Sequence, residues 1–294
     1  MTIATGVGSP LPPYVRPGRL EDALDILATE QRLVVAGGTD VYPAYASRPI
    51  DRPVLDITAL PALRGVVDDG DAWRIPALTT WTDLAEADLP PELDGFRAAA
   101  RTIGGRQIQN AGTVCGNVVN ASPAADSMPT LLALDAEVEI ASARGTRTLP
   151  VARFVLGNRT TDLRPGELVT GLRLPKVTGA SAPPGAVARS AFLKLGTRAY
   201  LVISIVAVSV VLVVADGVVA DARVAVGACS PVARRLPGLE GDLRGRRADA
   251  SLGAIAMVEH LADLSPIDDV RGTAAYRRDA CLTLVRRAIA EAAA

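Results

Sequence analysis

The feature that most restricts how this chain can fold is a polar, glycine-rich segment near its middle. Residues 101–126 have the sequence RTIGGRQIQNAGTVCGNVVNASPAAD, flanked on both sides by apolar regions. Glycine has no Cβ, so its backbone can take positive φ and its amide can approach a ligand closely. Runs of such amides form concave sites that bind anions without any charged side chain. The segment is too polar and too rich in glycine for an ordinary buried helix or strand. We therefore expect a loop against which an extended cofactor can lie.

A second glycine turn lies upstream, in residues 33–40, which have the sequence LVVAGGTD. Leu33, Val34 and Val35 are typical of a short buried strand that ends at Gly37 and Gly38. A strand that runs into a glycine turn can present backbone amides to a phosphate group. Each glycine pair alone indicates no more than a tight turn. The two together favour a clamp around a cofactor diphosphate.

Composition and charge exclude several classes of function. The formal net charge is −1 and no block is strongly basic, so electrostatic capture of nucleic acid or anionic lipid is not expected. Aromatic residues make up only 3% of the 294 residues, which argues against base stacking on the protein. The apolar run at 201–214 is too short for a membrane span of about 20 residues. We expect no nucleic-acid partner and no membrane insertion.

The cysteines and the N-terminus bear on the compartment and on metal binding. Cys115, Cys229 and Cys281 are far apart in sequence and form no CxxC, so the spacing predicts no iron–sulfur or zinc site in this chain. A sparse, odd count fits a reducing compartment, and the first residues lack the pattern of a signal peptide. We expect a cytoplasmic protein.

Periodicity and turn residues predict an alternation of helices and strands. A dinucleotide fold of the nicotinamide type is not expected, because no GxGxxG follows the first strand. Thr82 is the expected N-cap of a helix that starts near Trp81. A shift to Gly, Pro, Ala and Ser at 176–188 marks a domain boundary. The expected helices are 18–31, 96–103, 151–156, 251–262 and 271–292; the expected strands are 33–36, 54–57, 72–78, 137–142, 145–149, 167–174, 190–195, 201–214 and 218–226.

The last expected helix, 271–292, is amphipathic. Its apolar face includes Ala280, Leu284 and Ala288, and four arginines are assigned to the opposite face. We expect a solvated or partner-facing surface there, formed by Arg277, Arg278, Arg286 and Arg287. The only histidine, His260, is expected to be a surface or capping residue. Tyr200 is expected to be a packed tyrosine, with an approach to the expected cofactor as the other interpretation.

Three motifs together resemble one family. They are AGGTD at residues 36–40, the long pattern GxxQIxNxGTxxGNxxNASPAAD that ends at Asp126, and DVRGTAAYRR at residues 269–278. GEL at 166–168, RLP at 173–175 and FLKLGTR at 192–198 also fit it. The chain resembles, over residues 15–292, the FAD-binding medium subunit of the molybdenum hydroxylases, the group of xanthine dehydrogenase and carbon monoxide dehydrogenase.

The resemblance implies an α+β protein with a two-subdomain FAD-binding fold of the vanillyl-alcohol oxidase (PCMH) type and a C-terminal α+β domain of the CO dehydrogenase flavoprotein type. The implied organisation is a flexible arm at 1–14, an FAD-binding domain at 15–178 and a C-terminal domain at 186–294. The FAD-binding domain divides into subdomains at about 15–60 and 61–178, with FAD held between them.

The resemblance also implies the site residues. Around the first turn they are Leu33, Val34, Val35, Ala36, Gly37, Gly38, Thr39, Asp40 and Val41, with Ala36 to Asp40 on the diphosphate and ribityl region. A second clamp is formed by Thr113, Gly116 and Asn117. Asp126 lies in the same cleft, where it can accept from a hydroxyl or imide group, and Val169 and Lys194 lie beside the flavin. No catalytic side chain and no metal ligand is expected in this chain.

Cys115 is a departure from the family pattern. The second clamp of the family usually has the sequence TIGGN or TVGGN, and here it is TVCGN, with Cys115 in place of a glycine. If Cys115 takes positive φ, the strain is of order 1 kcal/mol or more. A reactive thiol beside the flavin is one interpretation; a buried, inert cysteine is the default.

The implied function is that of an electron-transfer subunit. Substrate is oxidised at molybdopterin on a large subunit, and electrons pass through iron–sulfur clusters of a small subunit to FAD here and then to an external acceptor. The expected assembly is a dimer of heterotrimers. Two alternatives stay open, a self-sufficient FAD-dependent oxidase and a flavin-free scaffold module.

Overall fold

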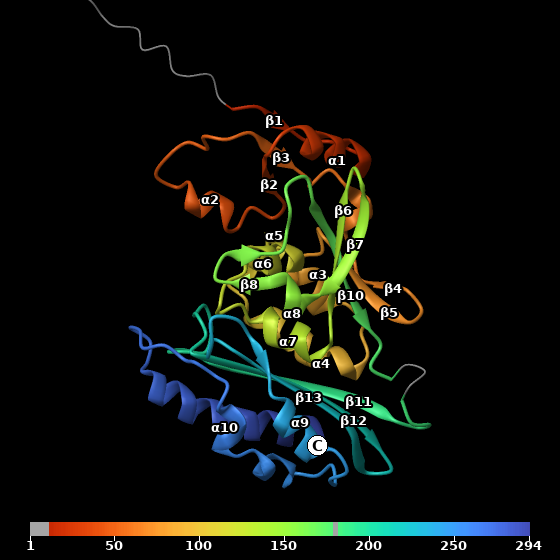
Figure 1. Cartoon of the computed structure of the whole chain (residues 1–294), viewed down its shortest axis with the longest axis vertical. Helices are drawn as coiled ribbons and strands as arrows, with labels where there is room; N and C mark the ends of the chain where they lie inside the picture. The colour runs from red at the N-terminus through yellow and green to blue at the C-terminus, as the bar shows by residue number, and fades with distance from the viewer. Residues whose placement is uncertain (1–11, 179–181) are drawn as a thin grey trace, which may run out of the picture.

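The structure is a computed structural model that describes residues 12–178 and 182–294. The expected arm at 1–14 lies almost entirely outside the described residues, as do positions 179–181 of the expected boundary. Figure 1 shows three regions along the long axis: a small N-terminal sheet at the top, a mixed body in the middle, and a sheet covered by a long helix at the bottom.

The N-terminal region is a three-stranded parallel sheet with one helix packed on it. The strand order is β1 (Tyr14–Val15), β3 (Val54–Asp56) and β2 (Leu33–Val35). Helix α1 (Leu20–Thr29) buries one apolar stripe, Ala23, Leu24 and Leu27, as its periodicity predicts. The chain leaves β2 through Gly37 and Gly38 and enters the short helix α2 (Val41–Ala44). The sheet therefore delivers the first glycine turn to the middle of the molecule.

The middle region is a five-stranded antiparallel sheet flanked by short helices. Its strand order is β4 (Val67–Asp68), β5 (Ala72–Pro76), β10 (Leu168–Pro175), β6 (Glu137–Ser142) and β7 (Gly145–Pro150). The helices are α3 (Trp81–Glu86), α4 (Asp94–Thr102), α5 (Arg106–Ala111), α6 (Val114–Asn120), α7 (Ser127–Ala133) and α8 (Val151–Phe154). A two-stranded ribbon of β8 (Val155–Gly157) and β9 (Thr160–Thr161) follows α8, and the 3-10 turns η1 (Pro61–Leu63) and η2 (Pro91–Leu93) connect elements.

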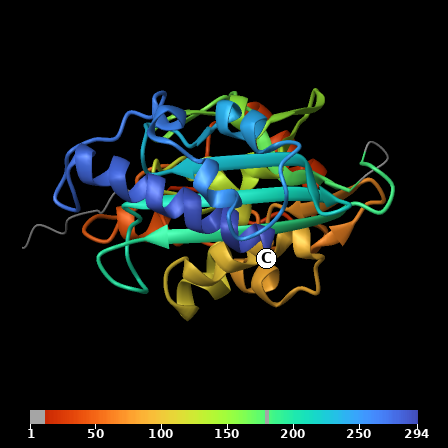
Figure 2. The ribbon, with the colours of Figure 1, turned by 90° about the horizontal axis from the view of Figure 1, so that it is seen from below.

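The C-terminal region is a four-stranded antiparallel sheet that is buried on both faces. The strands are β11 (Val187–Leu195), β12 (Val206–Ala215), β13 (Val218–Gly227) and β14 (Arg234–Arg235). Figure 2 shows α10 (Ala274–Ala293) lying along one face of this sheet. Side chains of β12 alternate between two cores, with Val211 and Val213 joining the middle region and Val210 and Leu212 joining the side of α10. Burial on both faces explains why β12 is an almost unbroken apolar run.

Several local expectations from the sequence are wrong. The central segment 101–126 is largely helical, as α5 and α6, instead of being a loop. The N-cap of α3 is Thr80, whose hydroxyl accepts from the amide of Asp83 at 3.1 Å in a capping box, so Thr82 is not the cap. The expected helix 251–262 is two 3-10 turns, η3 (Leu252–Ile255) and η4 (Val258–Leu261), and residues 201–205 lie outside β12, which starts at Val206.

The arginine face of the last helix is also only partly as expected. Arg278, Arg286 and Arg287 are exposed, but Arg277 is 2% exposed and lies inside the C-terminal region. Tyr200 is 70% exposed and therefore not a packed tyrosine. His260 accepts from the amide of Met257 through Nδ1, at 3.0 Å, so it serves as a capping residue of η4. No helix in the described residues is long and apolar enough to cross a bilayer.

Candidate functional site

The two glycine turns, far apart in sequence, pack directly against each other. A Cβ placed on Gly37 would lie 1.8 Å from the carbonyl oxygen of Ala111 and 2.9 Å from the Cα of Gly112. A Cβ on Gly112 would in turn lie 3.2 Å from Oγ1 of Thr39. Real atoms do not approach so closely, so Gly37 is required for main chain to pack on main chain. This contact brings the N-terminal sheet and the helices of the middle region together along one cleft.

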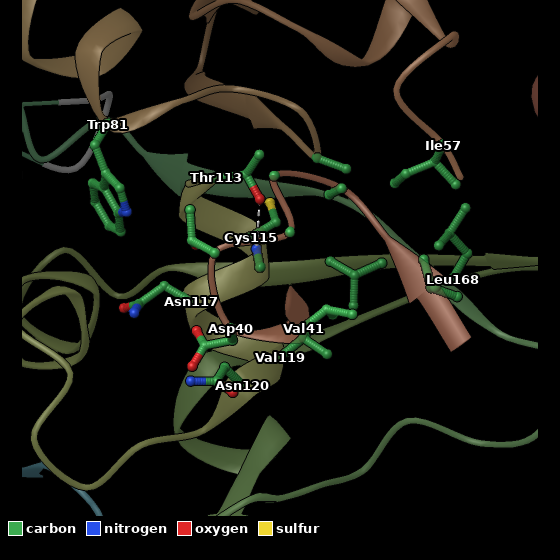
Figure 3. Close-up of a pocket in the computed structure, with 18 of the residues that line it drawn as sticks. Asp40, Val41, Ile57, Trp81, Thr113, Cys115, Asn117, Val119, Asn120 and Leu168 are labelled. Carbon is green, nitrogen blue, oxygen red and sulfur yellow. Dashed lines mark hydrogen bonds between the residues drawn. The ribbon is translucent and has the colours of Figure 1, made fainter. Parts of the chain in front are cut away.

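The cleft contains a cavity of about 420 Å³, shown in Figure 3. It is bounded by the turn after β2, by α6 and by the start of β10. Eleven of the fifteen expected site residues line this cavity: Val34, Ala36, Gly37, Gly38, Thr39, Asp40, Val41, Thr113, Gly116, Asn117 and Val169.

Four expected site residues lie off the cavity wall. Leu33 and Val35 belong to β2, and they support the turn from behind instead of facing the cavity. Asp126 and Lys194 are not among the residues that line the cavity, and they pair with each other. The expected residues thus form two groups, one on the cavity wall and one at the junction with the C-terminal region.

Among the residues that the structure describes, the backbone amides of the first turn have no protein partner. In the described part of the chain, the N–H groups of Gly37, Gly38, Thr39 and Asp40 donate to no other backbone or side-chain group. These residues line the cavity and are largely shielded from solvent, except Asp40. Partly buried amides usually find an acceptor. A row of free donors along a cavity therefore fits an anionic ligand such as a diphosphate.

Helix α6 forms the opposite wall, and Thr113 starts it. Oγ1 of Thr113 accepts from the amide of Gly116 at 3.1 Å, the bond drawn in Figure 3. A Cβ on Gly116 would lie 2.7 Å from that same oxygen, so glycine leaves room for the cap. Asn117 extends this wall, and its Oδ1 accepts from the hydroxyl of Ser127 at 2.6 Å. The Thr113–Gly116 cap bond and the Asn117–Ser127 hydrogen bond thus hold α6 in a fixed orientation along the cavity.

Cys115 sits in α6 with helical backbone, so the strain expected from positive φ is absent at this residue. Its side chain is 2% exposed, and Sγ lies 3.6 Å from the carbonyl oxygen of Ile75. Burial raises the pKa of the Cys115 thiol well above its ordinary value. A thiol held protonated is a poor nucleophile. Burial therefore favours the interpretation of Cys115 as a buried, inert residue of the cavity wall over that of a reactive thiol.

Apolar residues complete the cavity, and sequence reasoning missed them. They come from α3, α5, α6, β10 and several connecting segments, and include Ile57, Ala77, Trp81, Ile103, Ile108, Val119, Leu163 and Leu168. Nothing in a single sequence distinguishes such residues from ordinary core. Glu167 also lines the cavity, but Arg147 donates to both of its carboxylate oxygens at 2.8 Å, which lowers the pKa of Glu167. Its charge is therefore already paired.

The second group of residues forms a buried charged cluster at the junction. Nζ of Lys194, on β11, lies 2.5 Å from Oδ2 of Asp126, and the two side chains are 9% and 6% exposed. The hydroxyl of Ser204 donates to Oδ1 of Asp126, and Thr102 lies 3.4 Å from Oδ2. Asp126 directly precedes Ser127, the partner of the cavity residue Asn117. The cluster therefore adjoins one end of the cavity.

Comparison with known proteins decides the family. Residues 6–177 match the model of the FAD binding domain in molybdopterin dehydrogenase, and residues 191–292 match that of the CO dehydrogenase flavoprotein C-terminal domain. The chain belongs to the FAD-binding medium subunits of the molybdenum hydroxylase family. It is accordingly part of an oxidoreductase, and FAD is its cofactor.

Individual relatives of this FAD-binding subunit span nearly its whole length. It is 32% identical to the nicotine 6-hydroxylase medium subunit of Paenarthrobacter nicotinovorans, over 96% of this chain and 97% of that protein. It is 30% identical to the xanthine dehydrogenase FAD-binding subunit of Escherichia coli O157:H7, over 96% of both. Its fold matches a chain of reconstituted CO dehydrogenase from Oligotropha carboxidovorans with a TM-score of 0.85 and 27% identity, over 96% of this chain and 97% of that one. The expected α+β fold is confirmed.

Proposed function

We propose that this FAD-binding subunit is the electron-transfer subunit of a heteromeric molybdenum hydroxylase. In this proposal, substrate is oxidised on a large molybdopterin subunit, and a small iron–sulfur subunit carries the electrons to this chain, which delivers them to an external acceptor. We expect a cytoplasmic dimer of heterotrimers. Membership of the medium-subunit family supports the proposal. The observation that carries it is the row of free amides along the cavity between the two glycine turns.

The residues of the first turn fit the charged part of FAD. We assign the amides of Gly37, Gly38, Thr39 and Asp40 to the diphosphate, because they are unpaired and line the cavity. Main-chain donors can offset this negative charge although no lysine lines the cavity. Leu33 and Val35 hold the turn from the strand behind it. Ala36 and the side chains of Val34 and Val41 give the turn an apolar floor.

The opposite wall and the junction complete the assignment. Thr113, Gly116 and Asn117 hold α6 against the cofactor, and Val169 supplies an apolar contact from β10. Asp126 and Lys194 provide polar groups where the cleft meets the C-terminal region. Bound FAD supplies the redox chemistry, while this chain contributes position, charge and exclusion of water. The apolar lining, including Trp81 and Leu163, excludes water.

Purification of the complex and of the isolated chain tests this function. We expect the isolated chain to bind stoichiometric FAD, with absorbance in the flavin region, but to oxidise no substrate. The complex is expected to contain molybdenum and iron in other subunits, and its mass to match two copies of each of three chains. Reduction of the bound flavin when substrate is added to the complex, but not to the isolated chain, would support electron relay.

The same measurements distinguish the two alternatives. Turnover by the isolated chain would favour a self-sufficient oxidase and contradict the relay. A colourless chain that takes up no FAD on titration would favour a scaffold module. Cell fractionation checks the expected compartment.

A further inference from the structure

The motif DVRGTAAYRR, at residues 269–278, surrounds a buried arginine that the FAD site does not explain. Arg277 is 2% exposed, and its Nη2 lies 2.7 Å from Oδ1 of Asp269. The same carboxylate accepts from the amide of Arg271 at 2.8 Å and from its Nη1 at 3.0 Å. A buried guanidinium is costly unless it is paired and hydrogen-bonded. Within the motif, Asp269, which is itself bonded to Arg271, therefore orients the side chain of Arg277.

Arg277 is directed at two carbonyl groups from distant parts of the chain. Its Nη1 donates to the carbonyl oxygen of Ile205 at 2.7 Å and to that of Ala228 at 3.2 Å. A rigid guanidinium fork can serve several acceptors at once, which a lysine cannot do with the same geometry. Arg277 thus joins α10 to the start of β12 and to the turn after β13 (Figure 1).

Ile205 links this arginine to the charged cluster at the cleft. The amide of Ile205 donates to the carbonyl oxygen of Leu195 at 2.8 Å, and Leu195 follows Lys194 directly. Residue 204, on its other side, is the serine that donates to Asp126. Ile205, whose carbonyl group Arg277 holds, therefore follows Ser204 in the chain and is hydrogen-bonded to the residue after Lys194, and Ser204 and Lys194 both contact Asp126.

We propose that Arg277, oriented by Asp269, is a positioning residue that holds Ser204 and Lys194 on Asp126 across the junction. The inference rests on the proposed function in one respect, the presence of the flavin at this end of the cleft. Arg277 touches neither the cavity nor the cluster itself. It acts by fixing the backbone at Ile205 through its carbonyl group, so that the Asp126–Lys194 pair keeps one arrangement beside the cofactor.

The test uses the full chain with Arg277→Gln, and Arg287→Gln as the matched control. Arg287 is exposed on the same helix, so the control repeats the change of charge away from the network. Hydrogen exchange of peptides covering residues 203–206 reports the position of the Ile205 peptide without any need for FAD. We expect exchange there to be faster by about tenfold in Arg277→Gln and unchanged in Arg287→Gln. Unchanged exchange in both variants would overturn the proposal.

Flavin measurements test the consequence. We expect Arg277→Gln to weaken FAD binding by about threefold to tenfold and to shift the midpoint potential of the flavin that stays bound. Arg277→Lys is expected to recover part of the shift. Loss of thermal stability with an unaltered potential would show a structural role only, and would contradict the positioning role.

A double variant identifies the route. Ser204→Ala removes the serine contact to Asp126 directly. If Arg277 acts through Ser204, Arg277→Gln adds little further shift in potential to Ser204→Ala. A full additional shift would overturn the proposed route.

If Arg277→Gln does not fold, Asp269→Asn carries the same comparison, because it removes the charge that orients Arg277. A wild-type chain without FAD would contradict the proposed function, while the exchange of residues 203–206 would still decide the positioning role.

Discussion

The cavity wall is held together by contacts between backbone atoms, whereas the charged junction is held together by contacts between side chains. At the wall, Gly37 packs on the main chain of Ala111, and backbone amides of residues 37–40 line the cavity. At the junction, Asp126, Lys194 and Ser204 meet through side chains that come from two regions of the molecule. The wall depends on backbone shape, and it leaves no room for a Cβ at Gly37. The junction depends on charge balance and on three elements arriving together.

The largest effect that this comparison predicts comes from Gly37→Ala. The new Cβ would overlap a backbone carbonyl that cannot move aside as a flexible side chain can, so the two turns must separate. We expect about 3 kcal/mol of lost stability and loss of measurable FAD binding, assayed by chemical denaturation and FAD titration. Gly18→Ala is the control, because open space surrounds Gly18. Full FAD affinity in Gly37→Ala would show that the wall is not specified by backbone contact.

Asp126→Asn is expected to have the next largest effect. It leaves the ammonium of Lys194 buried without a carboxylate, at an expected cost of about 2–3 kcal/mol in the free energy of unfolding. The control is Glu86→Gln, which removes a carboxylate from the exposed pair with Arg106, and its effect is expected to stay below about 1 kcal/mol. Equal losses in the two variants would mean that burial of the junction pair has no energetic importance.

Cys115→Gly tests whether Cys115 contributes to the stability of the fold or to FAD binding on the cavity wall. It restores the family-like glycine but adds a glycine to α6 and removes a buried side chain, so we expect about 1–2 kcal/mol of destabilisation. FAD affinity should stay close to that of the wild type. In the folded wild-type chain, the raised pKa of Cys115 predicts no reaction with alkylating agents at mildly alkaline pH, which mass spectrometry of peptides can check. Rapid alkylation of Cys115 would contradict its description as inert.

The smallest expected effect is a pH dependence on the side of the junction held by Arg277. Hydrogen bonding from the amide of Arg271, with further bonds from Arg277 and Arg271, lowers the pKa of Asp269 to about 2. A carboxyl whose folded-state pKa is depressed stabilises the protein above its unfolded pKa, near 3.9, and loses that contribution as the pH falls toward 2. We expect Asp269→Asn to flatten the decline of unfolding free energy over this range, measured by denaturation at stepped pH. An unchanged slope would argue against the paired state of Asp269.

The parts of the site that a single sequence predicts are the local ones. The turn after β2 could be recognised because a buried strand and two adjacent glycines lie together in the chain. The helical form of the central segment was missed because its glycines count against a helix. They serve instead at the edges, with Gly105 and Gly112 capping α5 and Gly116 making room for the cap of α6.

Long-range contacts were beyond the sequence patterns. Periodicity assigned Arg277 to a solvated face, since a charge is seldom buried. Its acceptors are Ile205, Ala228 and Asp269, which come from separate segments. No local sequence pattern predicts that these segments meet at Arg277. The pairing of Asp126 with Lys194 depends in the same way on how two regions pack, although the family resemblance had singled out both residues.

The contact between Gly37 and Ala111 has a consequence for how the protein matures. It is made entirely of polypeptide atoms, so no prosthetic group is needed to seal the groove. A newly synthesised chain can complete its tertiary structure first and receive the nucleotide afterwards.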